Sequence, residues 1–332
     1  MAEITAQGGS PAEPRAARTA FIAVAPRNRG PWRDAARRLL ANRMALLGGA
    51  IVVLFIFLAI FGQYLAPRNA LQQDLTNIAA SPSGAHWFGT DELGRDFFSR
   101  ILAGARTALI VSVLVTFVSA GIGAAVGLIS AYVRGWVDSV FMRTADLLLA
   151  FPAFLLAAFL NATMRPSIKR LLTNVTNATG LGFVSGKEFI DFIVVFGALA
   201  VISWSGYARL IRSQALSLRE REFVEAARAI GAPTRIILFR HIMPNSIAPI
   251  IVAISVNFGG AILAESALSY LGVGIQPPTP SWGQMINANL DQWRYYPHLI
   301  LIPGGVLALL ILGFNFFGDG VADALDPRQS RR

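Results

Sequence analysis

The stretch REFVEAARAIGAPTRIILFRHIMPN, residues 221–245, decides how the rest of the chain is interpreted. It is the most highly charged internal stretch, and it lies between two long apolar runs. Residues 222–230 are good helix formers, Gly231 supplies the positive φ that ends a helix, and Pro233 suits the first turn of another. The stretch therefore predicts two short helices joined at a bend.

The sequence on both sides of this stretch is unusually apolar. Of the 332 residues, 54% are hydrophobic and 14% are charged, whereas soluble domains carry about 25% charged residues. The apolar residues form long uninterrupted runs, and a helix that crosses a bilayer needs about 20 of them. We therefore expect an all-α membrane protein.

Six apolar runs are predicted as transmembrane helices. They cover residues 44–66, 107–133, 140–162, 189–208, 246–271 and 297–318. Arginines gather before the first run, within residues 213–245 and after the last run, and the positive-inside rule places all three regions in the cytoplasm. Both termini are then cytoplasmic, as tails 1–43 and 319–332, whereas residues 67–105 and 161–188 form extracytoplasmic loops.

The net charge of +10 fits this topology better than it fits nucleic-acid binding, because the basic residues flank the apolar runs. The second extracytoplasmic loop departs from the charge bias, and its basic residues are Arg165, Lys169, Arg170 and Lys187. The first forty residues are polar and basic, which indicates a cytoplasmic tail rather than a cleaved signal peptide. The chain has no cysteine, which excludes disulfides and thiolate chemistry.

Two acidic residues fall inside predicted spans. A charge at the centre of a bilayer costs about 2.5–3.5 kcal/mol on insertion scales, so Asp146 and Glu265 should face protein or water. Each is a candidate for lining a translocation path, and a partner on a neighbouring helix is an equally good explanation. Pro152 either bends the third span or accommodates packing, and packing is favoured. The GAAVG pattern at 123–127 permits close helix contact.

The predicted extracytoplasmic loops hold a further candidate site. Asp91, Arg95 and Asp96 are spaced to form a cluster of ion pairs before the second span, and Trp282 lies in a Pro-rich loop after the fifth. These four residues are candidates for docking a partner or for gating the mouth of a path.

Signatures of catalysis are missing from the sequence. The GKE at 186–188 lacks the hydroxyl residue and the preceding glycine of a phosphate-binding loop, and the three histidines are scattered. We expect no catalytic residue, no metal site and no cofactor bound by this chain.

Several motifs together resemble one family. The residues Glu225-Ala226-Ala227, Gly231 and Pro244 resemble the EAA loop of ABC import permeases. The segment HWFGTDELGRD at 86–96 is similar to the signature of C-type subunits in dipeptide and oligopeptide importers, as is GFNFFGDG at 313–320. His241 departs from the general pattern, which has an apolar residue there, but HIMPN at 241–245 resembles the peptide branch. The resemblance covers residues 37–328 and is poor at 161–188.

This resemblance implies the fold and the partners. It implies a type-1 permease core over residues 106–318, with one preceding helix, that forms half of the pathway for peptides or related small solutes. The implied ATPase-coupling residues are Glu225, Ala226, Ala227, Gly231, Arg235, His241 and Pro244. The implied partners are a second permease in a heterodimer, two cytoplasmic ATPases that hold ATP and Mg, and an extracytoplasmic solute-binding protein, all at a bacterial inner membrane.

Two other classes of function remain open on the residues alone. A secondary transporter would need internal repeats and several ionisable residues at the midplane, and the sequence shows no obvious repeat. An intramembrane enzyme or assembly protein would need paired catalytic residues at one depth, which Asp146 and Glu265 do not provide.

Overall fold

The computed structural model describes residues 31–326, so most of the predicted N-terminal tail and the arginines after residue 326 lie outside the described residues. Regular structure in this range is helical, apart from an isolated bridge between Thr90 and Asp96. The elements are, in order, α1 Pro31–Ala41, α2 Arg43–Leu65, α3 Phe97–Val133, α4 Gly135–Ala150, α5 Ala153–Thr179, η1 Gly182–Ser185, α6 Lys187–Arg219, α7 Glu222–Ala229, α8 Thr234–Ile236, η2 Ile237–Ile242, α9 Met243–Tyr270, α10 Trp282–Ala288, η3 Leu290–Gln292 and α11 His298–Leu325.

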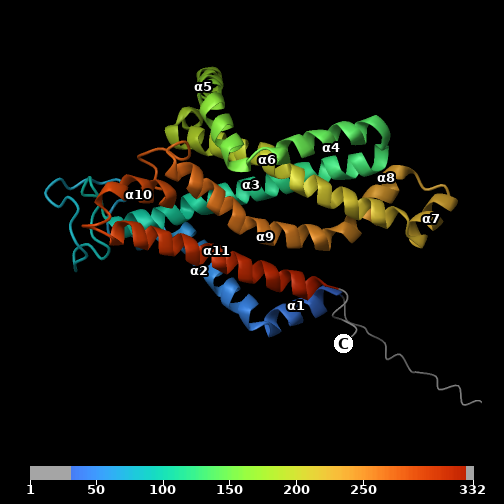
Figure 1. The fold of residues 1–332 in the computed structure, drawn as a ribbon, viewed down its shortest axis with the longest axis horizontal. Helices are drawn as coiled ribbons and strands as arrows, with labels where there is room; N and C mark the ends of the chain where they lie inside the picture. Colours follow the sequence, from blue (N-terminus) through green and yellow to red (C-terminus); the bar gives the residue numbers. More distant parts are fainter. Residues whose placement is uncertain (1–30, 327–332) are drawn as a thin grey trace, which may run out of the picture.

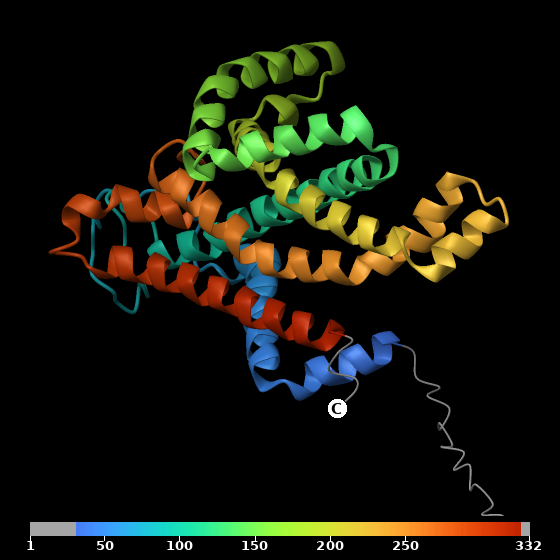
Figure 2. The ribbon, with the colours of Figure 1, turned by 45° about the vertical axis from the view of Figure 1, so that its right-hand side comes forward.

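The long helices run side by side and give the molecule two distinct ends (Figure 1). One end carries residues 66–96 together with α10, and we call it the cap end. The opposite end carries residues 220–242, including α7, and we call it the hairpin end. In Figure 2, α2 crosses α11, which it contacts closely.

Five helices are long and apolar enough to cross a membrane. They are α2, α3, α6, the continuous helix Thr234–Tyr270 and α11. A sixth crossing is possible only if α4 and α5 count as one broken span, because the pair is bent by 97°. The predicted all-α membrane fold is thus confirmed, with five continuous candidate spans and the bent pair α4 and α5 in place of the third predicted one.

The third predicted helix, over residues 140–162, is divided between two helices. α4 ends at Ala150, Phe151 has an extended backbone with φ −83° and ψ 144°, and Pro152 precedes α5. Proline disfavours helical backbone in the residue before it, so Phe151 leaves the helix. Pro152 accordingly lies at a bend, and the packing role favoured from sequence is not its main effect.

The predicted loop 161–188 is also wrong, because most of it is helical. α5 continues through these residues to Thr179, where Gly180 adopts a left-handed conformation with φ 74° and ends the helix. The polar residues of this segment interrupt a hydropathy run, but they do not prevent a helix whose polar side is exposed. Only Gly180 to Gly186 connects α5 to α6, by way of η1.

Other helix ends extend beyond the predicted runs. α3 begins at Phe97 rather than residue 107, because the Asp96 side chain caps it by accepting a hydrogen bond from the Ser99 amide at 2.9 Å. α6 continues past residue 208 to Arg219, and α11 past 318 to Leu325. At about 1.5 Å per residue, α3 exceeds the roughly 30 Å of a hydrocarbon core, so its ends reach past it.

Glycines allow close contact between α3 and α6. A Cβ atom at Gly123 of α3 would lie 2.4 Å from the Tyr207 Cβ of α6, and one at Gly127 would lie 2.6 Å from the Ala208 carbonyl oxygen. Distances this short leave no room for a side chain. The small-residue pattern at 123–127 is therefore confirmed as a packing surface between α3 and α6.

Candidate coupling and translocation site

The bend predicted at the hairpin end is present. The α7 helix ends at Ala229, and Gly231 follows with φ 78°. The Ala232 amide donates to the Ala227 carbonyl at 3.0 Å, and the Gly231 amide donates to the Arg228 carbonyl at 2.9 Å. This pair of hydrogen bonds is the Schellman arrangement, which needs a left-handed residue at the position of Gly231.

The helix that follows the bend is the beginning of a transmembrane helix rather than a separate short one. α8, η2 and α9 join into one helix from Thr234 to Tyr270. The η2 turn is π-helical, with the Met243 amide donating to the Leu238 carbonyl. Pro244 follows directly, and its missing N–H and bulky ring disturb the ordinary helical register of the preceding turn. Force applied to the bend thus acts directly on a long helix.

The two sides of the hairpin differ in burial. Val224 is fully buried and Ala227 nearly so, and they belong to a core cluster that includes Ile211 and Ala215 of α6. The opposite side exposes Glu225, Ala226, Arg235 and Pro244, whereas His241 is half-buried with its ring 6.3 Å from that of Phe223. The seven predicted coupling residues therefore lie on one hairpin, but Ala227 faces inward.

Exposed apolar side chains surround the bend. They are Phe223, Ile230, Ile236 and Phe239, of which Ile230 is 85% exposed. A cluster of this kind at a polar end of a protein indicates an interaction surface. This cluster was not predictable from the sequence, because each residue alone belongs to a normal amphipathic pattern.

A membrane-level cavity lies where α4 and α5 break. Its volume is about 460 Å³, and it is lined by residues of α3, α4, α5, α6 and α9. Its polar lining is uncharged and comprises Thr116, Ser203, Ser205, Tyr207 and Asn257. The buried Thr116 hydroxyl has no hydrogen-bond partner within residues 31–326, so it is available to a polar ligand. No motif in the sequence indicated this cavity.

The two candidate path residues do not line this cavity, and they lie apart. Asp146 of α4 is more than half exposed and forms an ion pair with Arg209 of α6 at 3.5 Å. Glu265 of α9 is 1% exposed, and it accepts hydrogen bonds from the hydroxyls of Ser269 at 2.8 Å and Ser281 at 2.9 Å. Each residue thus has a partner within this subunit, and its part in lining a path stays a prediction.

Two further acidic residues in helices were overlooked. Asp138 of α4 accepts two hydrogen bonds of 2.6 Å from Arg212 of α6 and a third from the Ser130 hydroxyl. Asp191 of α6 lies inside the predicted span 189–208, where it is fully buried. These carboxylates connect α4 and α6 to their neighbours.

Asp191 resolves the charge anomaly of the predicted loop 161–188. Arg165 of α5 donates to Asp191 at 2.5 Å and to the Gly274 carbonyl at 2.9 Å. The Gln276 amide donates to the other Asp191 oxygen at 3.0 Å. Arg165 and Asp191 therefore join α5, α6 and the segment 274–276 through polar contacts. The sequence contained one signal for this contact: an acidic residue inside a predicted span, close to a basic residue in a loop predicted to be extracytoplasmic.

The four residues predicted for docking or gating are all buried within this chain. Asp91 pairs with Arg95 at 2.7 Å and with Arg100 at 3.3 Å. Trp282 is 1% exposed and donates from Nε1 to the Ile101 carbonyl at 3.1 Å. Buried side chains are not open to direct docking, so we interpret this cluster as the attachment of residues 66–96 and α10 to the helices.

Asp96 pairs with a histidine instead of joining the arginines. Its carboxylate lies 2.9 Å from His86 Nδ1 and accepts hydrogen bonds from the Ser99 amide and hydroxyl. Burial raises the pKa of Asp96, but the hydrogen bonds from Ser99 and His86 outweigh burial and hold that pKa below its usual value. The carboxylate is therefore ionised at neutral pH.

Comparison with known proteins finds two matching family models. Residues 123–331 match the model described as binding-protein-dependent transport system inner membrane component. Residues 30–82 match the N-terminal transmembrane domain of oligopeptide transport permease C.

Relatives match over almost the whole chain. The dipeptide transport system permease protein DppC of Alkalihalophilus pseudofirmus is 39% identical over 90% of this chain and 90% of its own length. The glutathione transport system permease protein GsiD of Pectobacterium atrosepticum is 39% identical over 90% of this chain and 92% of its own. The glutathione transport system permease protein GsiD of Escherichia coli O6:K15:H31 is 38% identical over 90% of this chain and 91% of its own length.

Proposed function

Because the chain belongs to the family of binding-protein-dependent transport system inner membrane components, and is a multi-pass permease subunit of an ABC importer, we propose that its hairpin end takes force from ATPase subunits. The observation that carries this proposal is the exposed bend at Gly231, which continues directly into the membrane helix Thr234–Tyr270. An ATPase whose shape differs between nucleotide states would bias the conformation of that helix. Family membership decides against the secondary transporter and the assembly protein.

The distribution of arginines supports a cytoplasmic hairpin end. Arg134, Arg219 and Arg228 lie at the ends of α3, α6 and α7. Excess arginine marks cytoplasmic segments, so the cap end is extracytoplasmic and both termini are cytoplasmic. ATP and Mg are held by the ATPases, and this chain binds no cofactor and hydrolyses no ATP.

A second permease is proposed to cover the face formed by α4 and α5. Large apolar side chains are exposed on this face, and they include Leu147, Leu155 and Phe159. A heterodimer that covered them would enclose the cavity near Thr116 and Asn257 as part of a shared pathway. A solute-binding protein would deliver the solute at the cap end.

The proposed solute is a small peptide. The relatives named above are a dipeptide permease and glutathione permeases. Uncharged hydroxyl and amide groups in the cavity can bond to peptide groups whatever the side chains are, which suits transit rather than tight binding. Uptake of labelled dipeptides by the reconstituted importer is expected to fall with Asn257→Leu.

Co-purification tests the coupling proposal. The tagged chain is co-expressed with the second permease and the ATPases of the same transport system, and the retained ATPase is measured. Ile230→Asp and Glu225→Arg change exposed side chains, so the chain should still fold. Loss of a central interface contact costs about 2 kcal/mol or more, which weakens ATPase binding roughly thirtyfold or more and should lower the retained ATPase accordingly.

The matched control is Ile78→Asp, which alters a half-exposed residue at the cap end. Its ATPase retention should equal that of the unchanged protein. Full ATPase retention and transport by both hairpin variants would overturn the coupling proposal, as would the absence of ATPase from the unchanged complex.

A further inference from the structure

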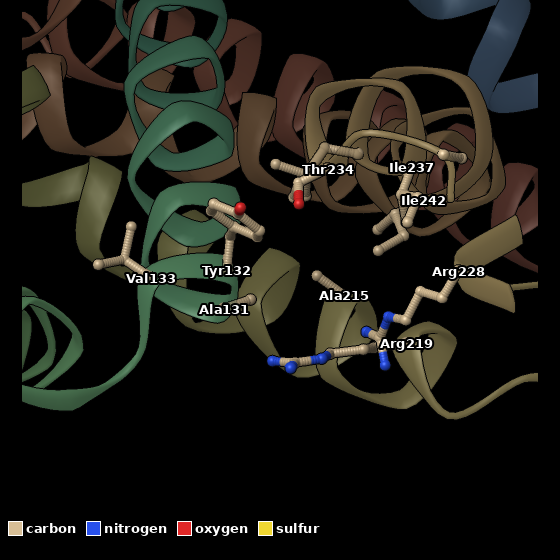
Figure 3. A pocket seen from close by; sticks show the side chains of 11 residues that line it. Ala131, Tyr132, Val133, Ala215, Arg219, Arg228, Thr234, Ile237 and Ile242 are labelled. Atoms are coloured by element: carbon tan, nitrogen blue, oxygen red, sulfur yellow. The ribbon is translucent and has the colours of Figure 1, made fainter. Parts of the chain in front are cut away.

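Another cavity, of about 560 Å³, lies at the hairpin end between the ends of α3 and α6 and the segment 228–242. Figure 3 shows the side chains that line it. Arg219 and Arg228 lie along one side, and Tyr132 and Thr234 lie on the other. We call this cavity the arginine pocket.

Within the described part of the chain, neither arginine of the pocket forms an ion pair. Among residues 31–326, no carboxylate lies within ion-pair distance of Arg219 or Arg228. The Nη1 atom of Arg219 is buried and makes no hydrogen bond within the same range. Arg134 and Glu220 also act on Arg219 electrostatically, so the cations near it outnumber the single carboxylate.

A buried guanidinium N–H without an acceptor is costly. The pocket therefore favours an anion that accepts several hydrogen bonds at once. Phosphate presents such oxygens in the geometry that arginine side chains match, whereas a small halide does not.

The rest of the wall is apolar. Ala131, Ile237 and Ile242 are buried residues that line the pocket, with Leu238 beside them. The pocket lies at one end of α3 and α6, two of the helices long enough to cross a membrane. Cationic groups beside an apolar wall at this level suit an amphiphile with an anionic headgroup.

We propose that the arginine pocket binds a phosphate group, supplied by an anionic phospholipid headgroup or by free phosphate. The bound group would bridge α6 to the hairpin through Arg219 and Arg228. Occupancy would then stiffen the bend on which an ATPase acts. The proposal does not depend on which solute is transported.

Native mass spectrometry of the full-length chain tests this binding. Delipidated protein in detergent is titrated with dioleoylphosphatidylglycerol or with dioleoylphosphatidylcholine, and bound lipid is counted. The test variant is Arg219→Gln with Arg228→Gln. The control is Arg221→Gln with Arg240→Gln, which removes the same charge from two exposed residues outside the pocket.

The unchanged protein and the control should retain phosphatidylglycerol in preference to phosphatidylcholine. The test variant should bind it roughly tenfold more weakly or worse, because two basic residues facing the headgroup are lost. Displacement of the lipid by millimolar inorganic phosphate, or binding of phosphate alone, would identify free phosphate as a ligand of the same pocket.

Equal loss of lipid in the test variant and the control would overturn the proposal, because it would indicate a diffuse surface effect. Unaltered binding of lipid and phosphate with loss of co-purified ATPase would also overturn it, because the arginines would then pair with carboxylates of the ATPase.

Discussion

At the scale of single residues, Asp96 combines a helix cap with a hydrogen bond to a histidine. Its carboxylate accepts from the Ser99 amide, which caps α3, and it contacts the His86 ring. The pKa of Asp96 is held below its usual value because these partners outweigh burial. A carboxyl group whose folded pKa lies below its unfolded pKa stabilises the fold above the unfolded value, which is about 4 for aspartate. This stability is lost as the pH falls through the folded pKa.

Asp96→Asn should therefore reduce the amount by which the free energy of unfolding falls as the pH is lowered. Asparagine still caps a helix, but it removes the charge, so we expect a loss of about 1 kcal/mol at neutral pH and a smaller difference below about pH 3. The measurement is the melting temperature of the purified chain at neutral pH and at successively lower pH, down to below about pH 3. Glu188→Gln, a change at an exposed residue in the first turn of α6, is the control. An equal loss at both extremes of pH would show that the charge of Asp96 does not matter.

Residue roles were predictable where the partners are close in sequence. The i, i+4 pair of Asp91 and Arg95 and the left-handed Gly231 both follow from local spacing. The bond between Arg165 and Asp191 joins two helices across a turn, and only the folded chain brings these residues together. Burial of Trp282 was equally invisible, because it depends on contact with α3.

At the scale of elements, the contact between α3 and α6 can be tested with two glycines of one helix. Gly123→Ala would place a Cβ atom 2.4 Å from the Tyr207 Cβ, whereas Gly121→Ala meets nothing within 4 Å. Overpacking costs about 1–3 kcal/mol, so Gly123→Ala should lower the free energy of unfolding by that amount. Gly121→Ala should be neutral or stabilising by up to about 1 kcal/mol. Equal stability of the two variants in denaturant titrations would show that α3 and α6 are not in tight contact.

Helix ends were the least predictable part of the elements. Hydropathy locates the apolar middle of a span, so the runs at 44–66 and 246–271 agree closely with α2 and α9. The ends are set by caps such as Asp96 and by polar turns that remain helical, as in the second half of α5. The length of an apolar run indicates neither the cap nor the polar turns.

At the scale of the whole molecule, the bent pair α4 and α5 is the part whose structure was least predictable from the sequence. A proline within an apolar run was visible, but the 97° angle between α4 and α5, which both pack against α6, was not. The exposed apolar face of this pair has no covering segment within residues 31–326. The subunit thus presents a surface that suits a second permease. Because the translocation path would lie between the two subunits, the sequence of one subunit does not define it.

The orientation of the two ends can be tested because the chain has no cysteine. Trp87→Cys marks the cap end and Ile230→Cys the hairpin end, and the two native residues are 60% and 85% exposed. A membrane-impermeant maleimide should label Trp87→Cys in intact cells but Ile230→Cys only after permeabilisation. Ala198→Cys, at a buried position, should react in neither case. Labelling of Ile230→Cys from outside would place the hairpin away from cytoplasmic ATP and contradict coupling at Gly231, whatever the variants of that hairpin do to transport.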